Sequence, residues 1–389
     1  MQCPFCQTRN SPRDRACQVC GGPLQGVNRL VSPSSQRKEV SPGNIAPFSK
    51  PVLPIDPIPE ISPAKPVLFA RQSREKNAPR IRAALFCRKE DEFYPLFALE
   101  NGELQLWDVQ GDELHLFPAR RTLFRPSLTT CAAFATVSGT VATGHESGQV
   151  RLQWLEQPNG NAAWKSHTLG TLEAHLGCVL SLAVAKTRLY SAGSDGTVVL
   201  TNLSDDRQAE IPPNRKSTVV LDGLSALSCL AVSLDGRLLA LGADDGQVQM
   251  WHLAEDGVQA HLDWTSRKDL SPVKSLMFAP NGNMLLSRNA QGQGCLWAAQ
   301  TGHRLPFIAQ PDTFISPAFA SDSRLLAHTN TSQEISLFDS WTGALQHTLP
   351  PVLGEVQAVS FSPARKTQAR EALLIVVTSQ QIHAWKVMF

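Results

Sequence analysis

The amino-acid sequence predicts an all-β protein whose seven small antiparallel sheets form a seven-bladed β-propeller. Three observations support this prediction. From about residue 80 onward, the 389-residue chain repeats with a period of about 46 residues. Within each repeat, short strand-like segments alternate with tight turns, and no segment keeps a sustained 3.6-residue apolar period. A parallel sheet with crossover helices is therefore disfavoured.

Two positions recur in every repeat. The first is an aromatic or aliphatic residue that ends an expected strand: Phe86, Phe134, Val184, Val232, Phe278, Phe319 and Phe361. The second lies 17 to 24 residues later and ends another expected strand: Trp107, Gln153, Thr201, Trp251, Trp297, Phe338 and Trp385. Six residues before each second position, a polar residue is followed by Gly or Gln, which suits a tight turn.

The fourth repeat shows the internal pattern of a blade best. Its short alternating segments are separated by Asp235-Gly236 and Asp245-Gly246, and Asp-Gly is a hairpin signal. The last repeat leaves no room for a fourth strand before residue 389. We expect the apolar residues 66–70 to supply that strand, because closing the ring in this way removes an exposed sheet edge. The predicted propeller then spans residues 66–389.

Residues 80–389 resemble the WD40-repeat family. The residues that carry the resemblance are Trp107-Asp108, Ser194-Asp195-Gly196, Asp245-Gly246 with Trp251, Trp297, Phe361-Ser-Pro363 and Trp385. The resemblance implies a hydrogen-bonded His–Ser–Asp–Trp set in a well-formed blade, with a structural and not a catalytic role. The third repeat offers His175, Ser191 and Asp195, but Thr201 stands where the Trp is expected. No repeat holds the whole set, so the repeats are expected to be degenerate.

Four cysteines near the N-terminus form two Cys-x-x-Cys pairs, Cys3 with Cys6 and Cys17 with Cys20. This spacing predicts one tetrahedral Zn²⁺ bound by four thiolates. With all four positions filled, no site remains open to water, so the zinc is expected to be structural. Its binding would supply the folding free energy of residues 1–24, which hold almost no apolar core.

The alternatives for these cysteines are a disulfide pair or a redox dithiol. A reducing cytoplasm, the compartment expected for this chain, disfavours the disulfide, and the missing βαβ context disfavours the redox dithiol. Residues 1–24 resemble the short bacterial zinc ribbons that precede unrelated domains, with Cys-Pro-x-Cys followed by Cys-x-x-Cys-Gly. Gln7 departs from this resemblance, because such ribbons usually carry Gly at that position.

Residues 25–65 are predicted to be a Pro-rich linker of extended, polyproline-like backbone. Apolar side chains alternate with the prolines of residues 51–63, so docking against the propeller or a partner stays open beside a spacer role. Residues 1–80 carry 12 Lys and Arg against 5 Asp and Glu, whereas residues 81–389 carry 24 against 29. A basic N-terminal part suits either a solvated tail or contact with an acidic surface or nucleic acid.

We expect a soluble cytoplasmic protein, because the chain has neither an apolar run of membrane-spanning length nor a signal region. The other five cysteines lie in strand-like segments and suit small buried hydrophobic positions: Cys87, Cys131, Cys178, Cys229 and Cys295. No esterase elbow, phosphate loop or dinucleotide fingerprint is present, and His145-Glu146 lacks the second His of a zinc protease.

The sequence therefore favours a non-catalytic scaffold or assembly adaptor that binds proteins, the subunits of a larger assembly, through the propeller. The zinc ribbon and linker would give a second contact. The first alternative is a nucleic-acid-associated factor that uses the basic ribbon, and the second is an enzyme with its site in the central channel. Neither a small-molecule substrate nor a catalytic residue is expected. The sequence does not indicate which partner or which propeller face is involved.

Overall fold

The computed structural model describes residues 66–388, apart from residues 76, 90–91, 109–112, 119–126, 157–163, 204–216, 225, 269–270, 306–313, 315, 331 and 364–370. The zinc ligands expected at Cys3, Cys6, Cys17 and Cys20 lie outside the described residues, as do the ribbon of residues 1–24 and the linker of residues 25–65. Within the described residues the regular structure is entirely β, and no helix is long and apolar enough to cross a membrane.

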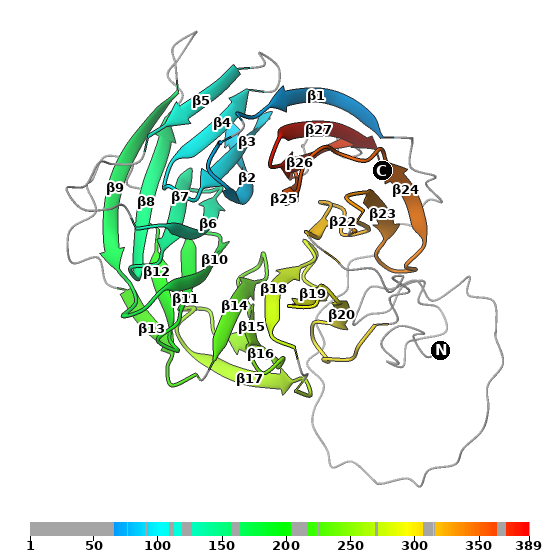
Figure 1. Cartoon of the computed structure of the whole chain (residues 1–389). Coiled ribbons are helices and arrows are strands. Elements are labelled where there is room, and N and C mark those ends of the chain that lie inside the picture. The colour runs from blue at the N-terminus through cyan, green and yellow to red at the C-terminus, as the bar shows by residue number, and fades with distance from the viewer. Residues whose placement is uncertain are drawn as a thin grey trace, which may run out of the picture.

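Seven antiparallel sheets stand around a central opening like the blades of a propeller (Figure 1). This confirms the predicted all-β, seven-bladed propeller. In blades 1 to 3 the chain runs outward through four strands. Blade 1 is β2 (Ile81–Lys89), β3 (Glu92–Leu99), β4 (Leu104–Asp108) and β5 (Glu113–Phe117); blade 2 is β6 (Thr129–Ala135), β7 (Thr140–His145), β8 (Gln149–Glu156) and β9 (Lys165–Glu173); blade 3 is β10 (Val179–Ala185), β11 (Arg188–Gly193), β12 (Val198–Asn202) and β13 (Ser217–Leu221).

Blades 4 to 7 repeat this order with two departures, in blades 5 and 7. Blade 4 is β14 (Leu227–Val232), β15 (Leu238–Ala243), β16 (Val248–Leu253) and β17 (Ala260–Thr265); blade 5 is β18 (Val273–Phe278), β19 (Met284–Asn289) and β20 (Gly294–Ala298); blade 6 is β21 (Ala318–Phe319), β22 (Leu325–Thr329), β23 (Ile335–Asp339) and β24 (Leu345–Leu349); blade 7 is β25 (Val356–Phe361), β26 (Glu371–Thr378), β27 (Gln381–Met388) and β1 (Val67–Ser73).

The outer strand of blade 7 is β1, which comes from before the first repeat. It pairs antiparallel with β27, so that Val67 lies opposite Lys386 and Ser73 lies opposite Gln381. The strand extends beyond the expected residues 66–70. Among the described residues, blade 5 has only three strands, and the chain beyond β20 adds one isolated bridge between Trp297 and Arg304.

Hydrophobic clusters fill the spaces between neighbouring blades, one at each of the seven interfaces. The second recurrent position lies on the third strand of each blade, where Trp251 is opposite Leu239 and Trp297 is opposite Leu285. Trp107 at this position is completely buried between blades 7 and 1. The sequence repeat therefore reflects a true structural repeat, in which each blade buries the same strand against its neighbour.

Each blade has its first strand nearest the central opening: β2, β6, β10, β14, β18, β21 and β25. Because the blades repeat the same antiparallel order around the ring, these first strands run the same way through it. Their first residues therefore lie at one face of the ring, here named the start face, and their last residues lie at the other, the end face. Turns between second and third strands belong to the start face, and turns between first and second strands belong to the end face. Because Val67 pairs with Lys386 near the end of β27, the chain enters β1 at the end face.

Candidate functional site

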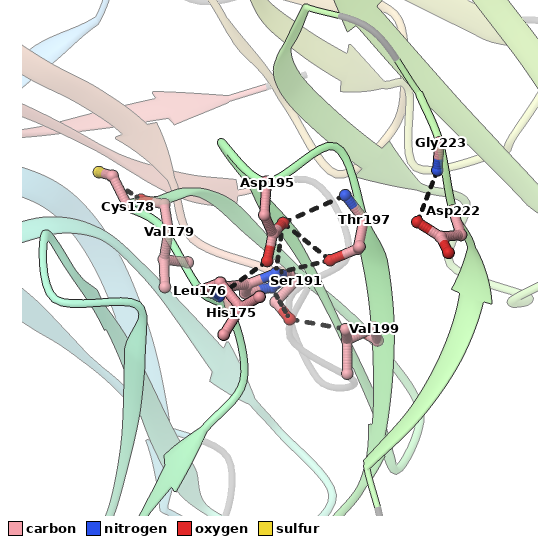
Figure 2. A network of polar contacts seen from close by, with 10 residues as sticks. All are labelled: His175, Leu176, Cys178, Val179, Ser191, Asp195, Thr197, Val199, Asp222 and Gly223. Atoms are coloured by element: carbon pink, nitrogen blue, oxygen red, sulfur yellow. Dashed lines mark hydrogen bonds and ion pairs between the residues drawn. The ribbon is translucent and has the colours of Figure 1, made fainter.

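A hydrogen-bond network around the buried side chain of His175 joins two loops at the start face of blade 3 (Figure 2). The Nε2 atom of His175 lies 2.8 Å from Ser191 Oγ, and its Nδ1 atom lies 3.2 Å from Asp195 Oδ1. The other carboxylate oxygen of Asp195 accepts a 2.8 Å hydrogen bond from the backbone N–H of Leu176. The hydroxyl of Thr197 donates to Asp195 Oδ1 at 2.8 Å. The network ties the segment before β10 to the turn after β11.

The charges in this network follow from burial and hydrogen bonding. Burial lowers the pKa of His175, and the nearby charge of Asp195 only partly opposes this effect. Burial acts to raise the pKa of Asp195, but the hydrogen bonds from Leu176 and Thr197 outweigh it, so the pKa is lowered. A neutral histidine therefore lies beside an ionised aspartate. Since a carboxylate only accepts, Nδ1 carries the proton and Nε2 accepts from the Ser191 hydroxyl.

The order Asp–His–Ser matches that of a serine hydrolase, but its setting does not suit acyl transfer. A nucleophilic hydroxyl must come within about 3 Å of a reacting carbonyl carbon. Ser191 is 2% exposed, and its Oγ lies 3.4 Å from the carbonyl oxygen of Val199 in the adjacent strand. The three side chains fix loops, which is the structural role that the WD40 resemblance implies.

Blade 3 lacks one member of the His–Ser–Asp–Trp set, and blades 4 and 5 hold only parts of it. Thr201, buried in β12, leaves blade 3 without its Trp. Blade 5 has the complementary half, because the indole N–H of Trp297 donates to Ser287 Oγ at 2.8 Å. In blade 4 the indole N–H of Trp251 donates instead to Gln249 Oε1 at 3.2 Å. The repeats are degenerate, as expected, and packing between blades maintains the ring where the polar set is incomplete.

The end face contains an apolar hollow of about 530 Å³ at the mouth of the central channel. Its wall includes the last residues of the innermost strands. Five of the seven first recurrent positions take part: Val184, Val232, Phe278, Phe319 and Phe361. The sequence predicted these residues as strand ends, and the ring brings them together around one opening.

A second cavity, of about 560 Å³, lies between blades 3 and 4 on the same face. Its lining includes three basic side chains, Lys186, Arg188 and Arg237, and two acidic residues, Asp235 and Glu255. Arg188 donates to the carbonyl oxygen of Glu255. Lys186 and Arg237 are exposed, and neither side chain has a hydrogen bond or ion pair to another described residue. This basic cleft therefore offers two uncommitted cationic groups.

One turn, residues 233–237, borders both cavities. The Ser233 hydroxyl donates to Asp235 Oδ1 at 2.6 Å, and the same oxygen accepts from the backbone N–H of Arg237 at 3.1 Å. These bonds fix the turn so that Leu234, 67% exposed, lines the hollow while Arg237 lines the cleft. The carboxylate of Asp235 therefore accepts hydrogen bonds within the turn itself.

The sequence did not indicate Leu234 or Arg237 as functional residues. The signal that was present is the leucine inside a Ser-Leu-Asp-Gly turn, where turn geometry requires no apolar side chain. By contrast, His145, which begins the incomplete zinc-protease motif His145-Glu146, is buried. Its Nε2 lies 3.1 Å from Thr143 Oγ1, and burial, with a smaller effect from Arg151, lowers its pKa to about 4.

The five cysteines of the described residues are free thiols, as the sequence suggested. Cys87 and Cys229 are buried, whereas the others are partly exposed. Burial raises the pKa of Cys87, Cys131 and Cys229 to about 12. These three thiols are therefore poor nucleophiles and behave as small hydrophobic side chains.

Comparison with known proteins supports the WD40 resemblance at one repeat. Residues 215–252 match the family model described as "WD domain, G-beta repeat". The Retinoblastoma-binding protein 5 homolog of Drosophila melanogaster is 31% identical over 108 residues, which cover 27% of this chain and 21% of that protein. The Apoptotic protease-activating factor 1 of Rattus norvegicus is 30% identical over 144 residues, covering 33% of this chain and 10% of that protein. The matches thus span about a fifth or less of these relatives.

Among solved structures, a chain in the crystal structure of the Mitotic Checkpoint Complex is similar to this one. The TM-score is 0.62 at 17% sequence identity, and the match covers 89% of this chain and 99% of that chain. At this identity the similarity shows a shared fold over most of the chain and nothing more.

Proposed function

We propose that this protein is a non-catalytic binding scaffold, an assembly adaptor, and that its propeller holds a partner protein on the end face. The observation that carries the proposal is the apolar hollow beside the basic cleft, with one fixed turn bordering both. Two similar proteins give support by their names, since one is called a retinoblastoma-binding protein and the other is part of a checkpoint complex. An exposed apolar surface rimmed by polar residues is typical of a protein interaction site.

The chemistry of the end face selects the kind of partner. Covering the hollow and the exposed side chain of Leu234 removes apolar surface from water, which stabilises a complex by roughly 25 cal/mol per Å². Lys186 and Arg237 attract carboxylates and accelerate association. The partner is therefore a protein segment that presents a large apolar side chain next to Asp or Glu.

Residues 1–65 act as a second contact in this proposal, with one Zn²⁺ held by Cys3, Cys6, Cys17 and Cys20. This second contact is supported by the entry of the chain into β1 at the end face. Residues 1–65 therefore join the ring on the face to which we assign the partner. A linker of about 40 residues reaches up to about 100 Å if it is extended, which allows two-point attachment to a large assembly. The free thiols suit a reducing compartment, and we place the protein in the cytoplasm.

The zinc part of the proposal is tested by metal content. Protein purified without chelator should hold zinc that Cys17→Ser removes, because three thiolates bind far more weakly than four. The melting temperature of the ring should not change, because in this proposal the ribbon and the ring fold separately. Equal zinc in the wild-type and Cys17→Ser proteins would contradict the predicted ligand set.

The binding proposal is tested by capture from extracts of the source cells. Three forms are compared: the full chain, residues 61–389, and residues 1–60. We expect residues 61–389 to capture the same protein with reduced avidity, and Leu234→Asp in the full chain to lose it. If residues 1–60 alone capture it as well as the full chain, the ribbon is the recognition module. If capture depends on nuclease-sensitive material, the nucleic-acid alternative is the better account.

A further inference from the structure

We propose that His252, His261 and Asp263 form a binding site for a divalent transition-metal ion, Zn²⁺ in particular, on the outer part of blade 4. The proposal does not depend on the four-cysteine motif or on the protein-binding function. It rests on the strand register, on the distances between the three side chains and on their chemistry.

The register of two neighbouring strands brings the three residues together. His252 in β16 lies directly opposite His261 in β17. Directly opposed residues have Cβ atoms about 5 Å apart, close enough for two imidazoles to share one ion. The pairing shifts beside them, because Leu262 pairs with Trp251 while Asp263 has no partner in the ladder. Such a bulge re-aims a side chain, here the carboxylate that approaches both histidines.

The distances fit an ion better than they fit direct hydrogen bonds. Asp263 Oδ2 lies 3.8 Å from His252 Nδ1, and Asp263 Oδ1 lies 3.7 Å from His261 Nε2. Both separations are too long for hydrogen bonds. The two rings are stacked with centroids 5.2 Å apart, and all three candidate ligand atoms lie within 4.8 Å of one another. Ligand atoms around tetrahedral zinc are about 3.3 Å apart, so small rotations of these side chains would close the site.

The side chains are free to make that adjustment. The side chains of His252, His261 and Asp263 are 44%, 72% and 29% exposed, and they lie on an outer hairpin, not in the core. Two imidazoles and one carboxylate suit Zn²⁺, and they also suit Cu²⁺ and Ni²⁺. Three protein ligands leave a fourth position open to water or to an incoming group, unlike a closed site of four thiolates.

The proposed metal site borders the proposed protein-binding surface of the end face. His252 belongs to the lining of the basic cleft between blades 3 and 4. An ion at this border adds positive charge to the cleft. The open position would accept a carboxylate, which is also the group that Lys186 and Arg237 attract.

The test is a calorimetric titration of the full chain with Zn²⁺, after any tight site has been filled and weakly bound zinc has been removed by dialysis against zinc-free buffer. We expect one further equivalent per chain in the wild type. His261→Gln and Asp263→Asn should each weaken its binding at least tenfold. Because both residues are on the surface, we expect these variants to have the same melting temperature as the wild type.

The matched control is His167→Gln. His167 in β9 is also an exposed outer-strand histidine, and its Nε2 lies 2.8 Å from one carboxylate, that of Glu156. One imidazole and one carboxylate make a poor site, so this variant should bind the further equivalent as the wild type does. Electron paramagnetic resonance with Cu²⁺ should show two imidazole nitrogens in the wild type and one in His261→Gln. The proposal is overturned if the wild type takes up no further equivalent, or if His261→Gln and Asp263→Asn bind it unchanged.

Discussion

The two faces of the ring use their polar side chains in different ways. On the start face, His175 and Asp195 are bound to each other and to the loops around them, and His145 is buried beside Thr143. On the end face, Lys186 and Arg237 are exposed beside an apolar hollow. His145, His175 and Asp195 therefore stabilise the fold on the start face, whereas Lys186 and Arg237 remain available to a partner on the end face.

The largest effect is expected from the strand that enters at the end face. Deletion of residues 1–75 removes β1 and exposes the edge of β27, so the melting temperature should fall by roughly 5–10 °C and the ring should self-associate. Deletion of residues 1–60 leaves β1 in place and should change neither property. Equal melting temperatures for the two deletions would show that β1 does not close the ring. Scanning calorimetry and light scattering make the comparison.

The start face should be the acid-sensitive one. Burial, with Arg151, holds the pKa of His145 at about 4, whereas an unfolded histidine titrates near 6.5. Between these values the unfolded chain binds more protons, so stability is lost as pH falls through this window, by up to about 3 kcal/mol for this residue. His145→Gln should flatten the dependence of unfolding free energy on pH. An unchanged slope between pH 7 and 4 would contradict the assignment.

A smaller loss is expected from the blade 3 network alone. His175→Ala leaves Asp195 and Ser191 without their common partner, which should lower the free energy of unfolding by about 2–3 kcal/mol. Partner affinity should stay within about twofold of the wild type, because the network lies on the start face. Chemical denaturation measures the first value and titration calorimetry the second. Loss of binding in a protein that still melts cooperatively would place the partner on the start face instead.

The smallest effect is expected from the cations of the cleft. Lys186→Glu and Arg237→Glu should each slow association a few-fold and weaken its dependence on salt, because exposed charges act mainly on encounter rates. Lys386→Glu is the control, since Lys386 lies on β27, in blade 7, 3.6 Å from Glu371. Stopped-flow association at two salt concentrations separates the variants. Identical rates for all three would remove the cleft from the binding surface.

The repeat made the fold predictable, because Trp107, Trp251 and Trp297 mark the third strand of their blades. The hollow was not predictable, since its lining converges only when the ring closes. Leu234 is exposed because a turn fixed by Ser233 presents it, which no apolar pattern reveals. The cluster of His252, His261 and Asp263 was not predictable for a related reason: the unpaired Asp263 breaks the two-residue period on which strand patterns depend.

Two leucines on opposite faces of the ring distinguish whether the partner binds the end face. Leu234 is 67% exposed on the end face, and Leu353, 61% exposed, precedes β25 on the start face. Replacing each with Asp introduces the same charge at a similarly exposed position on opposite faces. Titration calorimetry with the captured partner should give a dissociation constant raised roughly tenfold or more by Leu234→Asp and unchanged within about twofold by Leu353→Asp. Equal dissociation constants for the two variants, or a larger effect from Leu353→Asp, would show that the partner does not bind the end face.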